Sequence, residues 1–408
     1  MKQSSSDIDS PFSSGPVQRL LADLENSDVH KILLKHRDLL GIPTAELVKQ
    51  LQSRRKAKEK LPLYYHTPGA VFPPEENLEQ CSSEATARFK SHLIQTRFKG
   101  AALKSADLTG GFGVDTFFLS SISSEVHYVE PDQNLLRLAR YNHGLLKASN
   151  IAYHSALAEE FLQQTTTTFD VIYIDPSRRT ADKRRVYSLE DARPNVLGLK
   201  DAILERAKVM VVKTSPLLDI QAGISRLGNV ARVTIVALQN ECKELLFWCE
   251  SGKSVEPLIE AFNISTAGQA ESQFSFTFSE ERAALADTGP PQSFLHEPNA
   301  AILKAGAFKT IAQRYGLRKI HPHTHLYTSA EPVSDFPGRI FQVETFIKAD
   351  VGDVEKHFPD GKGNVMTRNY PLSPEALKKK IRLKDGGDNF LIAFSGTEKK
   401  YVAVARRL

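Results

Sequence analysis

The chain has 408 residues, of which 41% are hydrophobic and 25% are charged, and its formal net charge is +5. It is long enough to bury a full core in two or three domains, and its mildly basic balance fits a nucleic-acid partner without requiring one. Its three cysteines, Cys81, Cys242 and Cys249, are too few and too widely spaced for a disulfide framework or a zinc cage.

The chain shows no sign of export or membrane insertion. Its first residues lack the apolar core of a signal peptide, and no apolar run approaches the length of a membrane span. We therefore expect a cytoplasmic protein with reduced thiols, without membrane contact and without an obligate protein partner.

Residues 1–100 are expected to form an N-terminal helical region. Apolar residues recur at helical spacing from about Val17 to Lys60, after a start rich in Ser, Asp and Pro. The basic run "RRKAKEK" (residues 54–60) is interpreted as a solvated helix face, with an RNA contact as the alternative. A Pro-rich connector then leads to another helical stretch near residues 83–95.

Residues 101–252 are expected to form an α/β domain of Rossmann-like type. Short apolar runs alternate with amphipathic segments, which predicts a parallel sheet with helices on both faces. Seven runs are expected as strands: "ADLT", "EVHYVE", "IAYHSA", "FDVIYID", "KVMVVKTS", "ARVTIVAL" and "ELLFWCE". Only "QNECK" joins the last two, which is too short for a crossover helix and predicts a terminal antiparallel hairpin.

The remaining chain is expected to hold two small α+β modules, at residues 253–331 and 332–408. The first contains a helix-like "NAAILKAGAFKTIAQRYG" and a strand-like "IHPHTHLYTS". That strand would present His321, His323 and His325 on one face, but without a Cys or carboxylate pattern nearby we expect ordinary strand histidines and no metal.

The stretch "ADLTGGFGVD" (residues 106–115) places three glycines after the first expected strand of the α/β domain. In an open parallel sheet, ligands bind beyond the carboxyl ends of the strands, so this turn is a candidate ligand site. A dinucleotide fold requires G-x-G-x-x-G, but Thr116 stands where the third glycine belongs. The other candidate ligand is S-adenosylmethionine, for which Asp107 would be the acidic residue before the glycine turn. A tight strand-to-helix turn without a ligand remains the plain alternative.

Two further acids follow later strands. Glu130 ends the second strand, 23 residues after Asp107, where its carboxylate can accept both hydroxyl groups of a ribose. Asp175 and Pro176 follow the fourth strand and must open onto the same crevice. Three motifs at the ends of the first, second and fourth strands, in this order, favour the ligand site over chance.

With these motifs in view, residues 105–250 resemble the class I, Rossmann-like S-adenosylmethionine-dependent methyltransferases. The chain resembles more narrowly a bacterial group of these enzymes with a ferredoxin-like module and a C-terminal THUMP-like domain. The closer match rests on "LEQCSSEATA", "DLTGGFGVD", "DPSRR", "EPNAAILKAGAFK" and "RNYPLSPEALKKKIRLKDGGDNFLIA". The resemblance implies S-adenosylmethionine as cofactor, and its THUMP-like domain implies tRNA or rRNA as the substrate class. The cofactor-binding candidates are Asp107, Thr109, Gly110, Gly111, Gly113, Asp115 and Glu130.

The catalytic candidates are Asp175, Pro176, Ser177 and Arg178, which stand where amine methyltransferases carry Asp/Asn-Pro-Pro-aromatic. A carboxylate and a backbone carbonyl there accept the hydrogens of a base amine, and Arg178 replaces the ring that stacks on the flipped base. Carbon methylation of a pyrimidine requires a cysteine. Neither Ser177 nor "KTSP" (213–216) provides one, so this chemistry is not expected.

Basic residues follow the catalytic motif and recur near the C-terminus. Those after the motif are Arg178, Arg179, Lys183, Arg184, Arg185 and Arg193, and the C-terminal ones are Lys378–Lys380, Arg382 and Lys384. They are interpreted as phosphate contacts, with a solvated charged loop as the alternative. We therefore expect methylation of a base nitrogen in tRNA or rRNA. The alternatives are methylation of a protein or small molecule, and a non-catalytic RNA-binding protein on the same scaffold.

Overall fold

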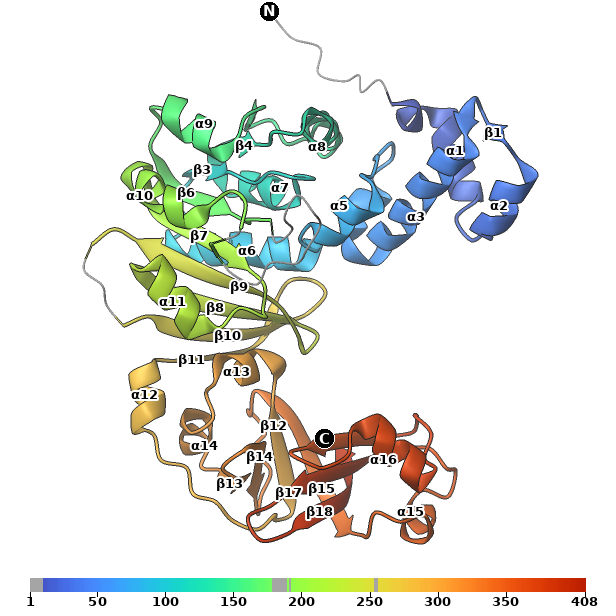
Figure 1. The fold of residues 1–408 in the computed structure, drawn as a ribbon, viewed down its shortest axis with the longest axis vertical. Coiled ribbons are helices and arrows are strands. Elements are labelled where there is room, and N and C mark those ends of the chain that lie inside the picture. Colours follow the sequence, from blue (N-terminus) through green and yellow to red (C-terminus); the bar gives the residue numbers. More distant parts are fainter. Residues whose placement is uncertain (1–9, 178–188, 191, 253–255) are drawn as a thin grey trace, which may run out of the picture. The chain divides into compact units, whose positions relative to one another are not determined.

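The N-terminal part of the chain folds into short helices around the longer helix α3 (Thr44–Lys60) (Figure 1). The computed structural model describes residues 10–177, 189–190, 192–252 and 256–408. The other elements of this part are η1 (Pro11–Ser13), α1 (Gly15–Asp23), α2 (Val29–Lys35), β1 (Asp38–Leu39), β2 (Ile42–Pro43), α4 (Pro62–His66), α5 (Glu75–Gln80) and α6 (Glu84–Arg97).

Two side chains of the basic run at residues 54–60 connect α3 to neighbouring helices of this region. Arg55 donates to the backbone carbonyls of Leu24 and Glu25, just beyond the end of α1. Lys60 donates to the carbonyls of Leu78 and Glu79 near the end of α5, 2.8 Å in each case. Cations at helix C-termini satisfy carbonyls that have no partner within the helix. The interpretation as a solvated face was therefore wrong for these two side chains.

The α/β part is built on a nine-stranded, mostly parallel sheet with strand order β11-β10-β8-β9-β7-β6-β3-β4-β5. Its strands are β3 (Leu103–Asp107), β4 (Ser123–Val129), β5 (Ile151–His154), β6 (Phe169–Ile174), β7 (Ala207–Thr214), β8 (Val230–Leu238), β9 (Glu241–Glu250), β10 (Leu258–Ile264) and β11 (Ala270–Phe276). Strands β3 to β7 pair in parallel, whereas β9 runs antiparallel to β7.

The order β7-β6-β3-β4-β5 reverses direction at β3, so a crevice opens beyond the carboxyl ends of β3 and β6. The predicted terminal hairpin is confirmed, since only Gln239 and Asn240 separate β8 from β9 and both have positive φ (49° and 65°). The predicted strand number was too low, because β10 and β11 extend this sheet. Their sequences carry no crossover helix that would mark them as part of an α/β alternation.

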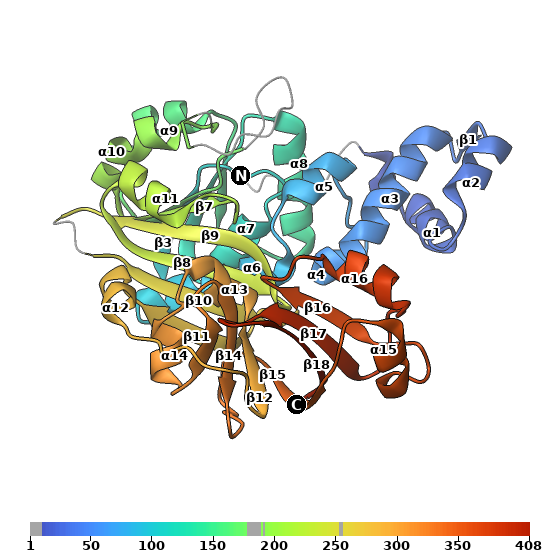
Figure 2. The same ribbon diagram turned by 60° about the horizontal axis from the view of Figure 1, so that its bottom comes forward.

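Helices cover both faces of this sheet. They are α7 (Val114–Ser120), α8 (Gln133–Leu145), α9 (Ala158–Gln164), α10 (Val196–Arg206) and α11 (Ile220–Leu227). Helix α7 packs with α6 on one face, while α9, α10 and α11 gather on the other (Figures 1 and 2). The last helix before the sheet, α6, thus belongs to its helical layers.

The C-terminal part is built on a seven-stranded sheet with order β13-β14-β12-β15-β18-β17-β16. Its strands are β12 (Phe294–Pro298), β13 (Arg318–His321), β14 (Thr324–Ser329), β15 (Gly338–Phe346), β16 (Asn364–Arg368), β17 (Asn389–Ser395) and β18 (Lys400–Arg407). Its helices are α12 (Phe278–Ala283), α13 (Ala300–Ala305), α14 (Thr310–Arg314), α15 (Val351–His357) and α16 (Pro374–Ile381). Strand β12 pairs with both β14 and β15, so the two predicted modules share one sheet.

Two expectations for this part were wrong in detail. The segment with three histidines is a hairpin, in which His321 ends β13, His323 lies in the turn and His325 lies on β14. The helix expected from residue 299 is two helices, because Gly306 ends α13 in the left-handed conformation (φ 83°).

By internal contacts the chain divides into two compact units. Residues 1–233, 243–255 and 264–270 form the first unit, and residues 234–242, 256–263 and 271–408 form the second. The predicted domain boundaries at residues 100, 252 and 331 stay predictions. In the described ranges, no helix is both long and apolar enough to cross a membrane.

Candidate active site

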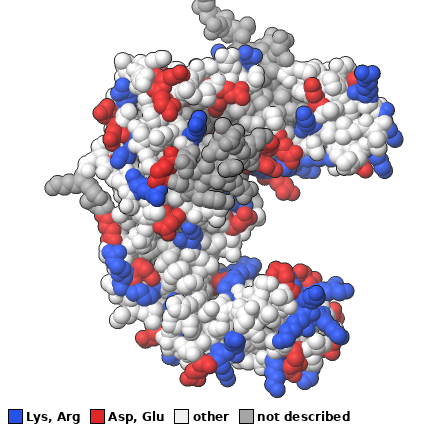
Figure 3. Space-filling view, viewed as in Figure 1, with Lys and Arg blue, Asp and Glu red and all other residues white. Residues whose placement is uncertain are grey.

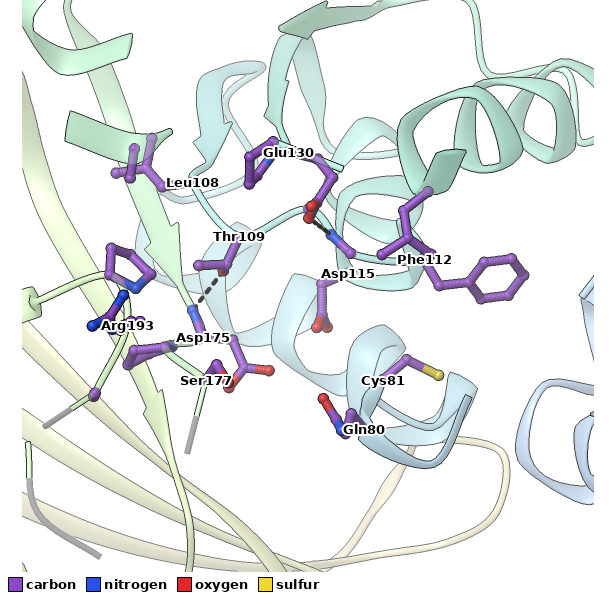
Figure 4. Close-up of a pocket in the computed structure, with 18 of the residues that line it drawn as sticks. Gln80, Cys81, Leu108, Thr109, Phe112, Asp115, Glu130, Asp175, Ser177 and Arg193 are labelled. Atoms are coloured by element: carbon purple, nitrogen blue, oxygen red, sulfur yellow. Dashed lines mark hydrogen bonds between the residues drawn. The ribbon is translucent and has the colours of Figure 1, made fainter. Parts of the chain in front are cut away.

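The carboxyl ends of β3, β4 and β6 open into a cavity of about 1140 Å³ within the first unit (Figure 4). The α/β part contributes the turn at 108–115, the residues after β4 and β5, the chain at 175–177, and residues 190 and 192–195. The N-terminal region contributes residue 77 and residues 79–82. A space of this size accommodates a nucleoside-sized cofactor together with an acceptor group.

The glycines of the turn are explained mainly by packing beneath it. A Cβ on Gly110 would lie 2.2 Å from the ring of Tyr128, and one on Gly113 would lie 2.6 Å from the imidazole of His143. Gly113 also has φ 84°, as the residue preceding α7. By contrast, a Cβ on Gly111 (φ 53°) would make only an ordinary contact, 3.8 Å from the backbone oxygen of Thr109, so only its backbone conformation favours glycine. All three glycines line the cavity, as predicted for a turn that a ligand approaches.

Asp107 is buried beneath this turn and is absent from the residues that line the cavity. One carboxylate oxygen accepts from the backbone N–H of Thr109 (3.0 Å), and the other accepts from the hydroxyl of Thr116 (2.7 Å). Burial raises the pKa of Asp107 to about 7. The structure thus gives Asp107 a place that shapes the turn, whereas the sequence predicted a cofactor contact.

Thr109 connects the ends of two strands. Its hydroxyl oxygen accepts from the backbone N–H of Asp175 (2.7 Å), which fixes the end of β6 against the turn after β3 (Figure 4). Because the same residue lines the cavity, a shift of the glycine turn would be transmitted directly to the catalytic candidates.

Glu130 lies on the cavity wall at the end of β4. Its two carboxylate oxygens accept from the backbone N–H groups of Gly111 (2.8 Å) and Asp132 (2.9 Å), as Figure 4 shows for the first. Each oxygen keeps a further lone pair, which is the acceptor pair that two ribose hydroxyls require. Burial raises the pKa of the Glu130 carboxyl above its ordinary value.

Asp175, Pro176 and Ser177 line the opposite side of the cavity, as the sequence predicted for the catalytic motif. Ser177 and Arg193 form an isolated β-bridge, so the chain returns to the cavity after residues 178–188. Arg193, itself on the cavity wall, is one of the predicted phosphate contacts. Arg178, Arg179, Lys183, Arg184 and Arg185 lie outside the described residues.

Asp175 is joined to buried charges that sequence reasoning missed. Lys213, near the end of β7, donates to Oδ2 of Asp175 at 2.5 Å and to the hydroxyl of Ser82 at 3.1 Å. Lys90, on α6, donates to the same hydroxyl at 3.0 Å. Ser82 in turn donates to Asp115 at 2.6 Å. The hydroxyl of Ser82 thus links strand β7, helix α6 and the first turn of α7.

We call Lys90, Lys213, Asp115, Asp175 and Glu244 the lysine–carboxylate cluster. Lys90 lies 3.1 Å from Asp115 and donates to both oxygens of Glu244 at 2.9 and 3.0 Å. Burial opposes ionisation of Asp115, but the two lysines hold its pKa below the ordinary value. Burial alone would lower the pKa of Lys213, yet the three carboxylates raise it above the ordinary value. The Lys213 side chain therefore stays charged inside the protein.

The N-terminal region brings Gln80 and Cys81 to the cavity, which the sequence did not predict (Figure 4). The thiol of Cys81 donates to the carbonyl of Leu78 (3.1 Å), and its sulfur is directed away from Asp175 in Figure 4. Burial raises the pKa of this thiol to about 11. A protonated thiol is a poor nucleophile, so the structure gives no support to carbon methylation through Cys81.

The donor set of the cavity fits S-adenosylmethionine. A carboxylate stands where ribose hydroxyls would donate, a glycine turn offers its open face at Gly111, and apolar residues form the neighbouring wall. That wall is made by Pro131, Leu135 and Leu157. No group of three or more His, Cys, Asp or Glu side chains in the described part of the chain is arranged to hold a metal ion.

Comparisons with known proteins agree with this description. A profile for a ferredoxin-like domain matches residues 294–337, and one for a THUMP-like domain matches residues 338–407. Two relatives named as uncharacterised S-adenosylmethionine-dependent methyltransferases, from Mycobacterium tuberculosis strains CDC 1551 and H37Rv, are 22% identical over 76% of this chain and 80% of their own. Ribosomal RNA small subunit methyltransferase J from Coxiella burnetii is 30% identical over 28% of this chain and 50% of that protein.

One solved structure matches nearly the whole chain. The crystal structure of a "putative methyltransferase" from Porphyromonas gingivalis W83 is 31% identical, with a TM-score of 0.84, and the match covers 96% of this chain and 97% of that one. The resemblance seen in the sequence is thereby confirmed. The chain belongs to the family of Rossmann-like S-adenosylmethionine-dependent methyltransferases that carry a ferredoxin-like domain and a C-terminal THUMP-like domain.

Proposed function

We propose that this protein methylates a nitrogen of an RNA base, with S-adenosylmethionine as the methyl donor. The observation that carries the proposal is the position of Asp175 and Pro176 on the wall of the same cavity as Glu130 and the glycine turn. The cavity thus joins a proposed cofactor side, with Glu130 and the glycine turn, to a side where Asp175 and Pro176 offer hydrogen-bond acceptors. A methyltransferase of a protein or a small molecule would use the same cofactor side but a different acceptor.

Glu130 and the turn at 109–113 would hold the cofactor. Glu130 would accept the ribose hydroxyls, while Gly111 would allow the methionine portion to lie against the backbone. When bound, S-adenosylmethionine would supply an electrophilic methyl group: the N–C bond would form as the C–S bond breaks, sulfur would keep the electron pair, and the proton released from the nitrogen would pass to solvent at the open cavity. Asp107 would act less directly, because it is buried beneath the turn, and Asp115 would act less directly, because it is paired with Lys90 and accepts from Ser82.

Asp175 and Pro176 would orient the acceptor nitrogen. The carboxylate of Asp175 and the backbone carbonyl of Pro176 are acceptors, and an exocyclic amine offers two N–H groups. Accepting these hydrogens directs the nitrogen lone pair and increases its electron density, which offsets the delocalisation that makes such amines weak nucleophiles. Ser177, next along the chain and on the cavity wall, would contact the base.

Three observations support RNA as the substrate. The C-terminal domain is THUMP-like, and the partial relative from Coxiella burnetii is named as a ribosomal RNA methyltransferase. Lys and Arg side chains gather over α15 and α16 in the second unit, interspersed with acids (Figure 3). The last turn of α16 alone carries Lys378, Lys379 and Lys380. Basic side chains on an exposed helix are suited to phosphate contacts.

The proposal is tested with RNA from a strain that lacks the gene. Total tRNA and rRNA from that strain and its parent are digested to nucleosides and compared by mass spectrometry. We expect one N-methylated nucleoside to be missing and to return when the purified protein and S-adenosylmethionine are added. If all nucleosides are unchanged while labelled methyl enters the protein fraction, the substrate class is wrong. If no fraction accepts methyl, the non-catalytic alternative is supported.

A further inference from the structure

A buried lysine contacts the proposed catalytic carboxylate directly. The Nζ atom of Lys213 lies 2.5 Å from Oδ2 of Asp175, and the Lys213 side chain is only 7% exposed. The Asp175 side chain is 25% exposed and lies on the cavity wall. One oxygen of Asp175 is therefore engaged inside the protein, while Oδ1 has no hydrogen-bond partner among the described residues and is left for a ligand in the cavity.

We propose that Lys213 is a positioning residue for methyl transfer, which anchors Oδ2 of Asp175 so that Oδ1 is presented to the acceptor N–H. This inference rests on the proposed function, since it requires that Asp175 receive the acceptor. A carboxylate on a single Cβ rotates about χ2, and its broad torsional preference does not fix which oxygen faces the cavity. A short charge-assisted hydrogen bond from a buried ammonium does fix it.

The surroundings hold Lys213 in place. Its ammonium also donates to the hydroxyl of Ser82 (3.1 Å), the residue directly before Ser83, whose side chain caps α6. The neighbouring carboxylates of Asp115 and Glu244 keep the ammonium charged and raise its pKa, so Lys213 cannot serve as a base in the reaction. Lys213 can therefore orient the Asp175 carboxylate and balance its negative charge.

Within the lysine–carboxylate cluster, Lys213 is the lysine that contacts Asp175. The lysine–carboxylate cluster holds three carboxylates against two lysines, and Lys90 already pairs with Asp115 and Glu244. Lys213 therefore supplies the ammonium that contacts the carboxylate on the cavity wall. Lys90 is similarly buried, with a side chain 3% exposed against 7% for Lys213, and its ion pairs within the described residues are with Asp115 and Glu244 and not with Asp175. This makes Lys90 a matched control for the loss of a buried charge.

The test compares Lys213→Met, Lys213→Arg and Lys90→Met in the full-length protein, with Asp175→Ala alone and combined with Lys213→Met. Turnover is measured as S-adenosylhomocysteine formed with the RNA, protein and small-molecule fractions of a strain lacking the gene. Cofactor affinity is measured by calorimetry, and folding is measured by thermal unfolding.

We expect Lys213→Met to lower kcat about 100-fold while S-adenosylmethionine affinity changes less than about threefold. Lys213→Arg should recover part of kcat, because a guanidinium also donates to Oδ2. The double variant should be no slower than Asp175→Ala, since residues that act as one unit are not additive. Lys90→Met should lower the unfolding temperature as much as Lys213→Met, with a much smaller loss of kcat.

Equal losses of kcat in Lys90→Met and Lys213→Met would reduce Lys213 to a structural role and overturn the inference. So would a double variant whose loss is the product of the single losses. If turnover occurs only with the protein or small-molecule fraction, the proposed RNA substrate fails, but the same comparison of variants is made on that fraction. Absence of turnover with every fraction contradicts both proposals.

Discussion

At the residue scale, the site combines side chains that the sequence could identify with others that it could not. Glu130 and Asp175 were predictable, because each follows directly on an apolar run and strand ends meet at one edge of a parallel sheet. The roles of Lys213 and Lys90 could not be predicted from the sequence. Buried lysines are rare, so a lysine in a sequence is assigned to the surface, and nothing in their spacing indicates a shared partner.

Asp107 shows what a sequence motif leaves open, and its predicted cofactor contact stays a prediction. Its place before the glycine turn matched the expected motif, but its oxygens are used by Thr109 and Thr116 beneath the turn. A motif gives the order of residues along the chain and leaves open which side of the turn a side chain faces. Packing against α7 decided that for Asp107.

Replacing Glu130 by Ala should weaken the binding of S-adenosylmethionine about 10- to 100-fold, or roughly 1.4–2.8 kcal/mol, because the acceptors for the ribose hydroxyls are removed. Calorimetry measures the affinity. Glu125→Ala is the control, since Glu125 lies on the same strand, is paired with Lys104 and does not line the cavity. Tight binding of NADH in place of S-adenosylmethionine, or unchanged affinity in Glu130→Ala, would contradict the cofactor assignment.

The buried His143 makes the glycine turn sensitive to acid. Its Nε2 lies 2.9 Å from the carbonyl of Gly113 and its Nδ1 lies 2.9 Å from the hydroxyl of Tyr153; burial lowers its pKa to about 4. The unfolded chain, with an ordinary histidine pKa near 6.5, takes up a proton first as the pH falls. The stability contributed by neutral His143 is therefore complete above pH 6.5 and is lost between pH 6.5 and 4.

We expect the difference in unfolding free energy between the wild type and His143→Gln to shrink by roughly 2 kcal/mol from pH 7 to pH 5. Chemical denaturation at several pH values measures it, and groups common to both proteins cancel in the difference. A difference that is constant over this range would show that His143 titrates normally in the folded protein.

At the element scale, the turn between β3 and α7 is the part of the fold on which the site depends. It contacts Tyr128 and His143 beneath it, and the buried Phe112 packs near Tyr64 of α4, with ring centroids 5.4 Å apart. The N-terminal helical region therefore supports the turn in addition to lining the cavity. Sequence patterns predicted both elements but not their contact, because nothing in either pattern specifies its partner.

Two glycines of this turn offer a matched pair of substitutions. Gly113→Ala should destabilise the protein by roughly 2–4 kcal/mol, because the new Cβ meets His143 and φ is 84°. Gly111→Ala should cost only about 1 kcal/mol, since its Cβ would make only an ordinary contact with Thr109 and the positive φ is the remaining strain. Denaturant midpoints give the comparison. If both variants lose the same stability, close packing by His143 is not what requires Gly113.

The seven predicted strands from β3 to β9 all exist, because buried parallel strands are continuous apolar runs that stand out from amphipathic helices. Strands β10 and β11 were assigned to the next module, since their composition differs from the preceding strands and no helix separates them. The histidine hairpin was missed because the turn at Pro322–His323 interrupts a run of strand-forming residues. Membership of a sheet depends on pairing, which local patterns do not encode.

At the scale of the whole molecule, the C-terminal sheet decides how RNA binding is best tested. Strand β12 of the ferredoxin-like match pairs with β15 of the THUMP-like match over five residues. Deleting residues 332–408 would remove that partner and expose an unpaired strand edge, so a truncated protein would aggregate for reasons unrelated to RNA. Charge substitutions on the exposed surface avoid this.

Changing Lys379, Lys380 and Arg382 to Glu should weaken RNA binding and reduce the slope of log affinity against log salt concentration by about 2, because fewer phosphate contacts release fewer counterions. All three side chains are exposed. The control changes the exposed Lys31, Lys35 and Lys49 to Glu, which alters net charge equally. Identical salt titrations for the two variants would remove α16 from the RNA-binding surface.

The central claim is that Asp175 orients an RNA base nitrogen and does not hold the cofactor. The most direct test measures, for wild type and Asp175→Ala, the transfer of labelled methyl to RNA from a strain lacking the gene, together with the affinity for S-adenosylmethionine. We predict that transfer falls at least about 100-fold while affinity stays within about threefold. Wild-type transfer by Asp175→Ala, or a loss of transfer that merely follows a loss of cofactor affinity, would contradict the claim.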